Sequence, residues 1–148
     1  MYKHIFVSTD GSRLSDRAVN AAIALAHELG AKLTAFHAME EYPIMPYPDY
    51  AAAIESFTPE IWNADQQKRA KRILNKAQAA AEKAGIACST KSAAAMHPHE
   101  AILQAAKKAR CDLIVMASHG RRGIQALVLG SETNKVLTHG KLPVLVVH

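Results

Sequence analysis

The chain has 148 residues, the size of one globular domain with a single core, and 49% of them are apolar and 21% charged. The formal net charge of +5 favours anionic partners, but no run of five basic residues occurs, so nucleic-acid binding is not indicated. No stretch approaches the roughly 18 consecutive apolar residues of a membrane span, and the N-terminal apolar run is too short for a signal peptide. We therefore expect a cytoplasmic protein.

Strand-like and helix-like segments alternate along the chain. Short runs of β-branched and aromatic residues end at turn residues, and the segments between them carry apolar residues at three- and four-residue spacing. Residues 40–57, with three prolines and three tyrosines, predict a loop. The expected strands are 4–8, 31–39, 86–95, 112–117 and 142–147. The first expected helix is capped by Ser12 or Ser15 and ends at Gly30. The other expected helices are 59–84, 98–110 and 131–139.

This alternation predicts a single α/β domain over residues 1–148. Long crossovers join the strands and hairpin turns are absent, so we expect an open, five-stranded parallel sheet with helices on both faces, a Rossmann-like arrangement. Such sheets bind ligands beyond the carboxyl ends of the strands, where the winding order reverses. If the fourth strand lies beside the first, the loop at 9–12 and the loop after residue 117 meet there.

The segment ASHGRRGIQALVLGS at 117–131 has the composition of a phosphate-binding loop. Gly120 and Gly123 permit positive φ and close approach of backbone amides to an oxyanion, and Gly130-Ser131 opens a helix whose N-terminal N–H groups favour phosphate. A side chain at Gly120 or Gly130 is expected to stand where phosphate oxygens must go. The same glycines also suit an ordinary turn and an ordinary helix start, so their spacing has to decide.

The spacing excludes two common nucleotide motifs and matches a third. No GxGxxG follows the first strand, and no GxxxxGK[ST] occurs. The pattern Ala117-2x-Gly120-9x-Gly130-Ser131 instead resembles G-2x-G-9x-G-[ST], the signature of the ATP-binding branch of the universal stress protein family. The similarity runs through TDGS, HAM, DLIVMASHGRRG, GSETNKVL and PVLVVH, and so spans the whole chain. It implies the adenine nucleotide alpha-hydrolase-like version of the parallel-sheet fold.

The resemblance also implies a binding site for ATP with Mg²⁺, between the loops after the first, second and fourth strands. Two positions depart from a simple phosphate cradle. Ala117 stands where the signature has its first glycine, and Glu132 brings a negative charge close to the phosphates. The implied nucleotide-binding residues are Ser8, Thr9 and Asp10 for adenosine, Ala38 for adenine, and Met116, Ala117, Gly120, Arg121, Gly130, Ser131 and Glu132 for the phosphates.

Some of the polar side chains near this site have a second interpretation. Asp10 suits hydrogen bonds to ribose hydroxyls, but it also suits capping of the turn before the first helix. Arg121 and Arg122 suit bidentate pairing with phosphates, but also solvation on a loop. His97 and His99 flank a proline with no third ligand nearby in sequence, so no metal site is predicted.

No catalytic residues are predicted. Ser118 and His119 are adjacent in sequence, which does not by itself make a nucleophile and its base, and there is no G-x-S-x-G elbow. Slow ATP hydrolysis remains an alternative that the sequence does not separate from simple binding. The two cysteines, Cys88 and Cys111, form no CxxC pair and are expected to be buried free thiols.

The last strand, Pro143 to Val147, is almost entirely apolar, and an exposed sheet edge of this kind invites pairing. Pairing with a second copy gives a homodimer, which the family resemblance also implies. Two functions remain open from the sequence: an ATP-binding dimeric regulator of stress responses or signalling, and a dimeric interaction protein of the same fold that binds no nucleotide.

Overall fold

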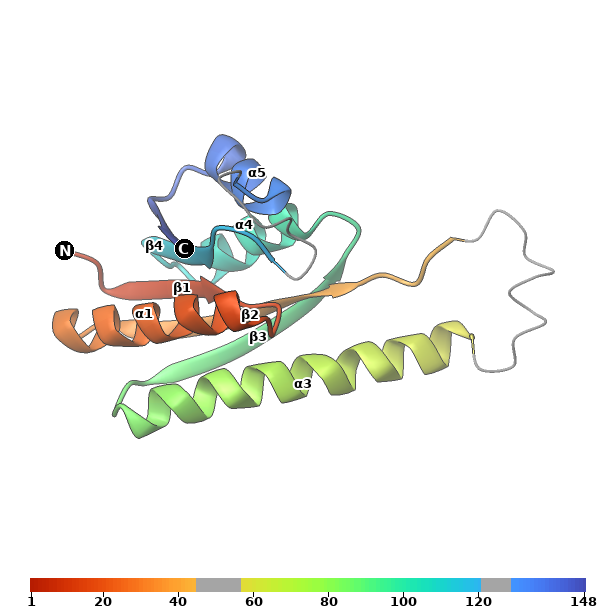
Figure 1. The fold of residues 1–148 in the computed structure, drawn as a ribbon, viewed down its shortest axis with the longest axis horizontal. Helices are drawn as coiled ribbons and strands as arrows, with labels where there is room; N and C mark the ends of the chain where they lie inside the picture. The colour runs from red at the N-terminus through yellow and green to blue at the C-terminus, as the bar shows by residue number, and fades with distance from the viewer. Residues whose placement is uncertain (45–56, 121–128) are drawn as a thin grey trace.

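The computed structural model describes residues 1–44, 57–120 and 129–148, which form the predicted parallel sheet. Figure 1 shows the sheet with its helices. Part of the loop predicted at 40–57 lies outside the described residues. The strands are β1 (His4–Ser8), β2 (Lys32–Glu40), β3 (Cys88–Ala95), β4 (Leu113–Ala117) and β5 (Val144–Val147), and the helices are α1 (Arg13–Leu29), α3 (Pro59–Lys83), α4 (Pro98–Lys108) and α5 (Ser131–His139).

The strand order β3-β2-β1-β4-β5 confirms the expected topology. β1 pairs in parallel with β2 on one side and with β4 on the other, Val7 lying opposite both Ala35 and Val115. The winding reverses between β1 and β4, as predicted, so their carboxyl ends form the switch point. Every residue of β4 is buried, which fits its continuous apolar run in the middle of a doubly covered sheet.

Two apolar layers hold the helices against the sheet. α1 and α3 cover one face, and α4 and α5 cover the other (Figure 1). Because side chains alternate along a strand, Ile5 and Val7 pack beneath α1, whereas Phe6 points to the opposite layer. There its ring lies 5.5 Å from the ring of Phe36, and both side chains are almost fully buried. The predicted helices on both faces are therefore confirmed.

The helix ends follow the capping chemistry of the sequence. Ser12 is the N-cap of α1, and its Oγ accepts the Ser15 N–H at 3.1 Å. Gly30 ends α1 with a φ of 62°, a conformation that glycine adopts without strain. The expected bounds differ at some ends: α4 stops at Lys108, and β3 and β5 begin at Cys88 and Val144. Within the described ranges, none of the helices has both the length and the apolarity that crossing a bilayer requires.

The two cysteines are free thiols, as predicted, but their burial differs. Cys111 is buried and Cys88 is only partly so. Burial is the main cause that raises the pKa of Cys111 to about 11, and it also raises the pKa of Cys88. The Cys111 side chain belongs to the layer under α4 and α5, whereas Cys88 packs against the layer under α1 and α3. A disulfide between them is not compatible with this fold.

Candidate functional site

The loops after β1 and β4 meet at the switch point. A Cβ atom built on Gly120 would lie only 2.7 Å from Oδ2 of Asp10, so the backbone of one loop touches the carboxylate of the other. These residues are far apart in sequence, and only the adjacency of β1 and β4 brings them together. The expectation that these two loops meet is confirmed.

The end of β1 is held rigidly by hydrogen bonds to β2 and α1. The Thr9 N–H donates to the carbonyl of Phe36 at 2.9 Å, and the ring Nδ1 of His37 lies 2.8 Å from the carbonyl of Thr9. Because a carbonyl only accepts, Nδ1 of His37 carries the proton. The Thr9 hydroxyl lies 3.0 Å from the Ser15 hydroxyl in the first turn of α1. Both Thr9 and His37 are buried, so this corner is preorganised.

Asp10 uses its two carboxylate oxygens differently. Oδ1 accepts the Ser12 N–H at 3.0 Å, the turn-capping role that the sequence allowed, and Oδ2 lies toward Gly120. The next residue, Gly11, has a φ of 80°, which favours glycine, and a Cβ there would lie 3.0 Å from Ile73 of α3. Capping therefore fixes the orientation of the Asp10 carboxylate, and Ile73 of α3 packs against the turn.

The end of β4 and the start of α5 are joined in the same way. The Gly130 N–H donates to the carbonyl of Ser118 at 2.7 Å, and the hydroxyl of the buried Thr133 donates to the carbonyl of Ala117 at 2.8 Å. Gly130, the N-cap of α5, has no side chain to cap the helix, and the N–H groups of the first turn, starting at Ser131, point beyond the helix. Together with the helix dipole, they make this end attractive to an anion.

The structure gives Gly120 and Gly130 a reason to be glycine that was not predicted from the sequence. Neither Gly120 nor Gly130 has a positive φ. A Cβ on Gly120 would meet the Asp10 carboxylate, and one on Gly130 would lie 2.9 Å from Cα of His119. A side chain at either position would therefore collide with protein atoms, because the two loops approach so closely. Gly123 lies outside the described residues.

Ala117 fits its position, although the signature has glycine there. It is the last residue of β4, and its methyl is buried in the layer between the sheet and α1. The positive φ that would penalise alanine does not occur. The methyl group therefore adds to the core, and only the backbone of Ala117 is available to a ligand. The same holds for Met116, whose side chain is buried in the opposite layer.

The carboxylate of Glu132 is engaged by neighbouring residues. Oε2 accepts the backbone N–H of His99 at 2.8 Å and lies 3.1 Å from its ring Nδ1, while Lys135 lies 3.3 Å from Oε1. Partial burial opposes ionisation, but these hydrogen bonds outweigh it and lower the pKa of Glu132. The negative charge at the start of α5 is thus engaged by His99 of α4 and by Lys135 of α5 itself.

The other predicted site residues lie around this junction. Ser8 and Ala38 are half-buried on the neighbouring strands β1 and β2, and Ser8 pairs with Phe36, two residues before Ala38. Arg121 and Arg122 lie outside the described residues. The structure thus brings Asp10 to Gly120 and sets the start of α5 beside them.

Ser118 and His119 do interact, which sequence adjacency alone did not predict. The hydroxyl of Ser118 lies 3.3 Å from Nδ1 of His119. Ser118 is 4% exposed, however, so its oxygen is not presented to a substrate. We assign the contact a local structural role at the end of β4.

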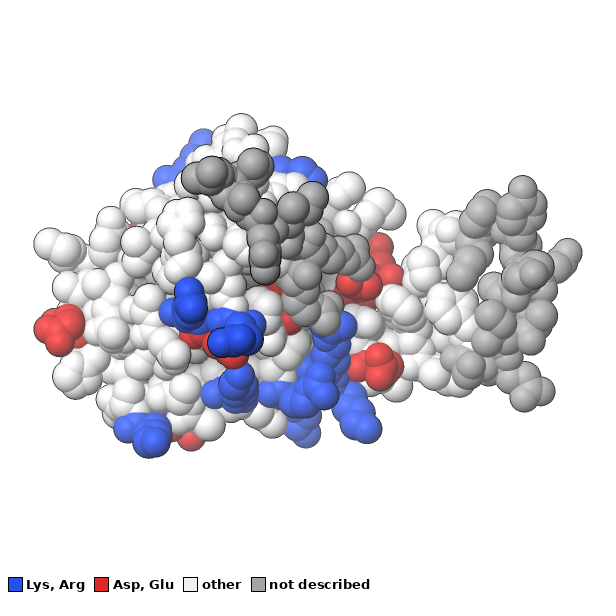
Figure 2. All heavy atoms as spheres, in the orientation of Figure 1, with Lys and Arg blue, Asp and Glu red and all other residues white. Residues whose placement is uncertain are grey.

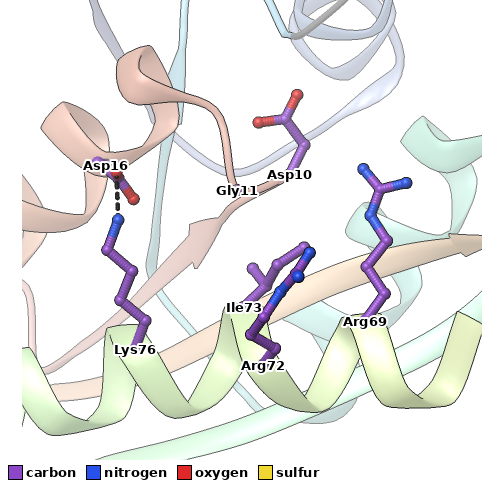
Figure 3. Close-up of a pocket in the computed structure, with 7 residues that line it drawn as sticks. All are labelled: Asp10, Gly11, Asp16, Arg69, Arg72, Ile73 and Lys76. Atoms are coloured by element: carbon purple, nitrogen blue, oxygen red, sulfur yellow. Dashed lines mark hydrogen bonds and ion pairs between the residues drawn. The ribbon is translucent and has the colours of Figure 1, made fainter.

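A basic cavity beside Asp10 was not predicted from the sequence. It encloses about 320 Å³ between the start of α1 and the middle of α3 (Figure 3). Figure 2 shows lysine and arginine side chains gathered over α1 and the middle of α3. The spacing of Arg69, Arg72 and Lys76, three and four residues apart, was the available signal, because it puts them on one side of a helix. The lining residues are Asp10, Gly11, Asp16, Arg69, Arg72, Ile73 and Lys76.

Comparisons with known proteins agree with this fold. The model of the universal stress protein family matches residues 1–148. A universal stress protein of Thermus aquaticus is 36% identical over 147 residues, which covers 99% of each chain. The solved structure of MJ0577 from Methanocaldococcus jannaschii has 26% identity and a TM-score of 0.80, over 99% of this chain and 96% of that one.

A second solved structure, a universal stress protein in complex with cAMP, has 27% identity and a TM-score of 0.70, over 99% of this chain and 97% of that one. The match of the family model and the relative that is 36% identical both cover nearly the whole chain. The chain therefore belongs to the universal stress protein family.

Proposed function

We propose that the chain binds ATP, together with Mg²⁺, across the loops after β1, β2 and β4. The observation that carries this proposal is the close approach of Asp10 and Gly120 beside the start of α5, where the N-cap is a glycine. It joins an acceptor suited to ribose hydroxyls with N–H donors suited to phosphates. The solved relative in complex with cAMP, which is also an adenine nucleotide, supports the same class of ligand.

Each of the three strand ends contacts a different part of the nucleotide. The backbone of Ala38 at the end of β2 meets adenine, and Asp10 with the backbone of Ser8 and Thr9 meets ribose. The phosphates lie over Gly120 and the first turn of α5. Mg²⁺ enters with the phosphates and neutralises part of their charge, and we assign it no side-chain ligand. Bound ATP then changes which partners the protein recognises in a stress response.

Isothermal titration calorimetry with ATP is the direct test. We expect a dissociation constant in the micromolar range or tighter, on the order of −8 kcal/mol, with weaker binding when Mg²⁺ is chelated. Mass spectrometry of the purified protein should also reveal nucleotide carried through purification. A folded protein that binds neither ATP nor another adenine nucleotide would contradict the proposal and favour a nucleotide-free interaction protein.

We also propose that β5 forms the interface of a homodimer, in which the segment from Pro143 to Val147 pairs with its symmetry mate. β5 pairs with β4 at the edge of the described sheet, and Leu145 on this strand is 40% exposed. An apolar edge strand of this kind is a template for a second chain. The two copies would extend one sheet across the interface.

Replacing Leu145 with lysine tests the dimer. We expect the dimer dissociation constant to rise at least about tenfold, because the substitution puts a charge into an apolar interface. Sedimentation velocity at several concentrations measures the change. Leu137→Lys is the matched control, since Leu137 on α5 is 42% exposed and lies outside the proposed interface. A wild-type chain that is monomeric at high concentration, or equal effects of the two variants, would argue against the interface.

A further inference from the structure

The cavity between α1 and α3 carries more positive than negative charge. Five charged side chains line it, three basic and two acidic. Nζ of Lys76 lies 2.6 Å from Oδ2 of Asp16, so this lysine is paired and ties α3 to the first turn of α1 (Figure 3). Asp10, the other acidic group, has its Oδ1 bonded to the backbone of the turn. Arg69 and Arg72 supply the remaining charge.

Arg69 and Arg72 lie three residues apart on α3, and both line the cavity. Within the part of the chain that the structure describes, neither guanidinium makes a hydrogen bond or an ion pair. Like charges three residues apart on a helix repel each other. Arg69 is half-buried, and its side chain extends from α3 along the side of the cavity toward the level of Asp10 (Figure 3). Such a pair is suited to a doubly charged oxyanion, because a planar guanidinium binds phosphate through two parallel hydrogen bonds.

The position of the cavity indicates which part of a nucleotide this anion belongs to. In the proposed site, adenine lies at β2, ribose at β1 and the 5′-phosphates at β4, because β1 is the middle strand of the three. The cavity shares Asp10 with the proposed ribose position and is also lined by the next residue, Gly11. It lies against α3, which packs on β2 and β3, and its lining includes no residue of α5, where the 5′-phosphates are proposed to lie. A group reaching it leaves the nucleotide from the ribose hydroxyls.

We propose that Arg69 and Arg72 form a subsite for a phosphate group carried on a ribose hydroxyl, so that the chain prefers adenine nucleotides with a second phosphate on the sugar. This inference rests on the proposed nucleotide site and adds a specificity that the loops after β1 and β4 do not provide. Asp10 alone would repel a phosphate at this position, and the two arginines compensate that repulsion.

Calorimetry with three ligands tests the subsite: AMP, adenosine 3′,5′-bisphosphate and adenosine 2′,5′-bisphosphate. These ligands differ only in the phosphate on the ribose. We expect one of the bisphosphates to bind at least about tenfold more tightly than AMP, the effect of one charge-assisted bidentate contact. In Arg69→Gln and in Arg72→Gln this preference should fall to about twofold or less, while the affinity for AMP stays within about twofold of the wild type.

Lys71→Gln is the matched control. Lys71 lies on the same helix but does not line the cavity, so its replacement removes the same charge from α3 without removing a contact in the cavity. This variant should keep the full preference for the bisphosphate, which separates direct contact from a general loss of positive potential. Circular dichroism establishes that all three variants are folded, and the affinity for AMP establishes that the nucleotide site is intact.

The other outcomes overturn the inference in distinguishable ways. If AMP and ATP bind but no bisphosphate is preferred, the subsite is wrong and the proposed function stands. If the arginine variants weaken ATP and AMP as much as the bisphosphates, the arginines serve the 5′-phosphates instead. If pyrophosphate binds in an Arg69-dependent manner but no bisphosphate is preferred, the cavity is a site for a free anion. If no nucleotide binds to the folded wild type, both proposals fail.

Discussion

Gly130→Glu is expected to weaken ATP binding by about a hundredfold or more. Two effects act together. The new side chain starts at a position where its Cβ would lie 2.9 Å from Cα of His119, so the loop and the start of α5 must separate. The added carboxylate also stands beside the N–H groups proposed to receive the phosphates, where a like charge repels them. Calorimetry with ATP and Mg²⁺ measures the loss.

Asn134→Glu is the control for the added charge. Asn134 is exposed on the same helix, one turn further along, so the variant has the same net charge without the new Cβ contact. We expect it to bind ATP within about threefold of the wild type, because solvent and salt screen an exposed charge. Equal loss in the two variants would mean that long-range charge, and not the geometry at Gly130, governs binding. Unchanged ATP affinity in a folded Gly130→Glu protein would contradict the proposed site.

Phe6→Ala is expected to lower the free energy of unfolding by about 3–5 kcal/mol. Phe6 is fully buried in the central strand, and its ring packs against Phe36 in the layer under α4 and α5. Removing the Phe6 ring leaves a cavity that β2 and β4 cannot fill, because their pairing with β1 fixes their positions. Urea unfolding followed by circular dichroism measures the change.

Ile61→Ala offers a comparison on the surface. Ile61 is 49% exposed on α3, and its truncation should cost less than about 1.5 kcal/mol. A similar cost for the two substitutions would mean that the layer around Phe6 relaxes freely and contributes little. A second outcome of Phe6→Ala follows from the main-chain bond between Phe36 and Thr9: a shift of Phe36 should also disturb the end of β1, and with it the proposed ribose position.

Much of the fold was predictable from the sequence because its signals are local. The apolar run of β4, the Ser12 cap and the Gly30 terminus each depend on neighbouring residues, and each appears where predicted. The meeting of the loops after β1 and β4 was also predictable, since it follows from topology. The effect of having Ala117 in place of the first signature glycine was harder to predict, because the sequence does not show that the methyl group of Ala117 points into the core.

The basic cavity was not predictable in the same way. Arg69, Arg72 and Lys76 have the spacing of a solvated basic face, which is common on long helices. What distinguishes them is the placement of α3 against the first turn of α1, fixed by Ile73 under Gly11 and by the pair of Lys76 with Asp16. These contacts join residues about 60 positions apart, and no local pattern encodes them.

Ser118 connects the two proposed interfaces of this protein through its own peptide groups. Its N–H donates to the carbonyl of Val147 on β5 at 2.8 Å, and its carbonyl accepts the Gly130 N–H at the start of α5. A displacement of β5 at Val147 is therefore expected to shift the start of α5 at Gly130, and the reverse, because Ser118 bonds to both. Thermodynamic reciprocity then applies: whatever factor ATP imposes on self-association, self-association must impose on ATP affinity. Nucleotide titrations at different protein concentrations consequently report on the subunit contact as well as on the ligand.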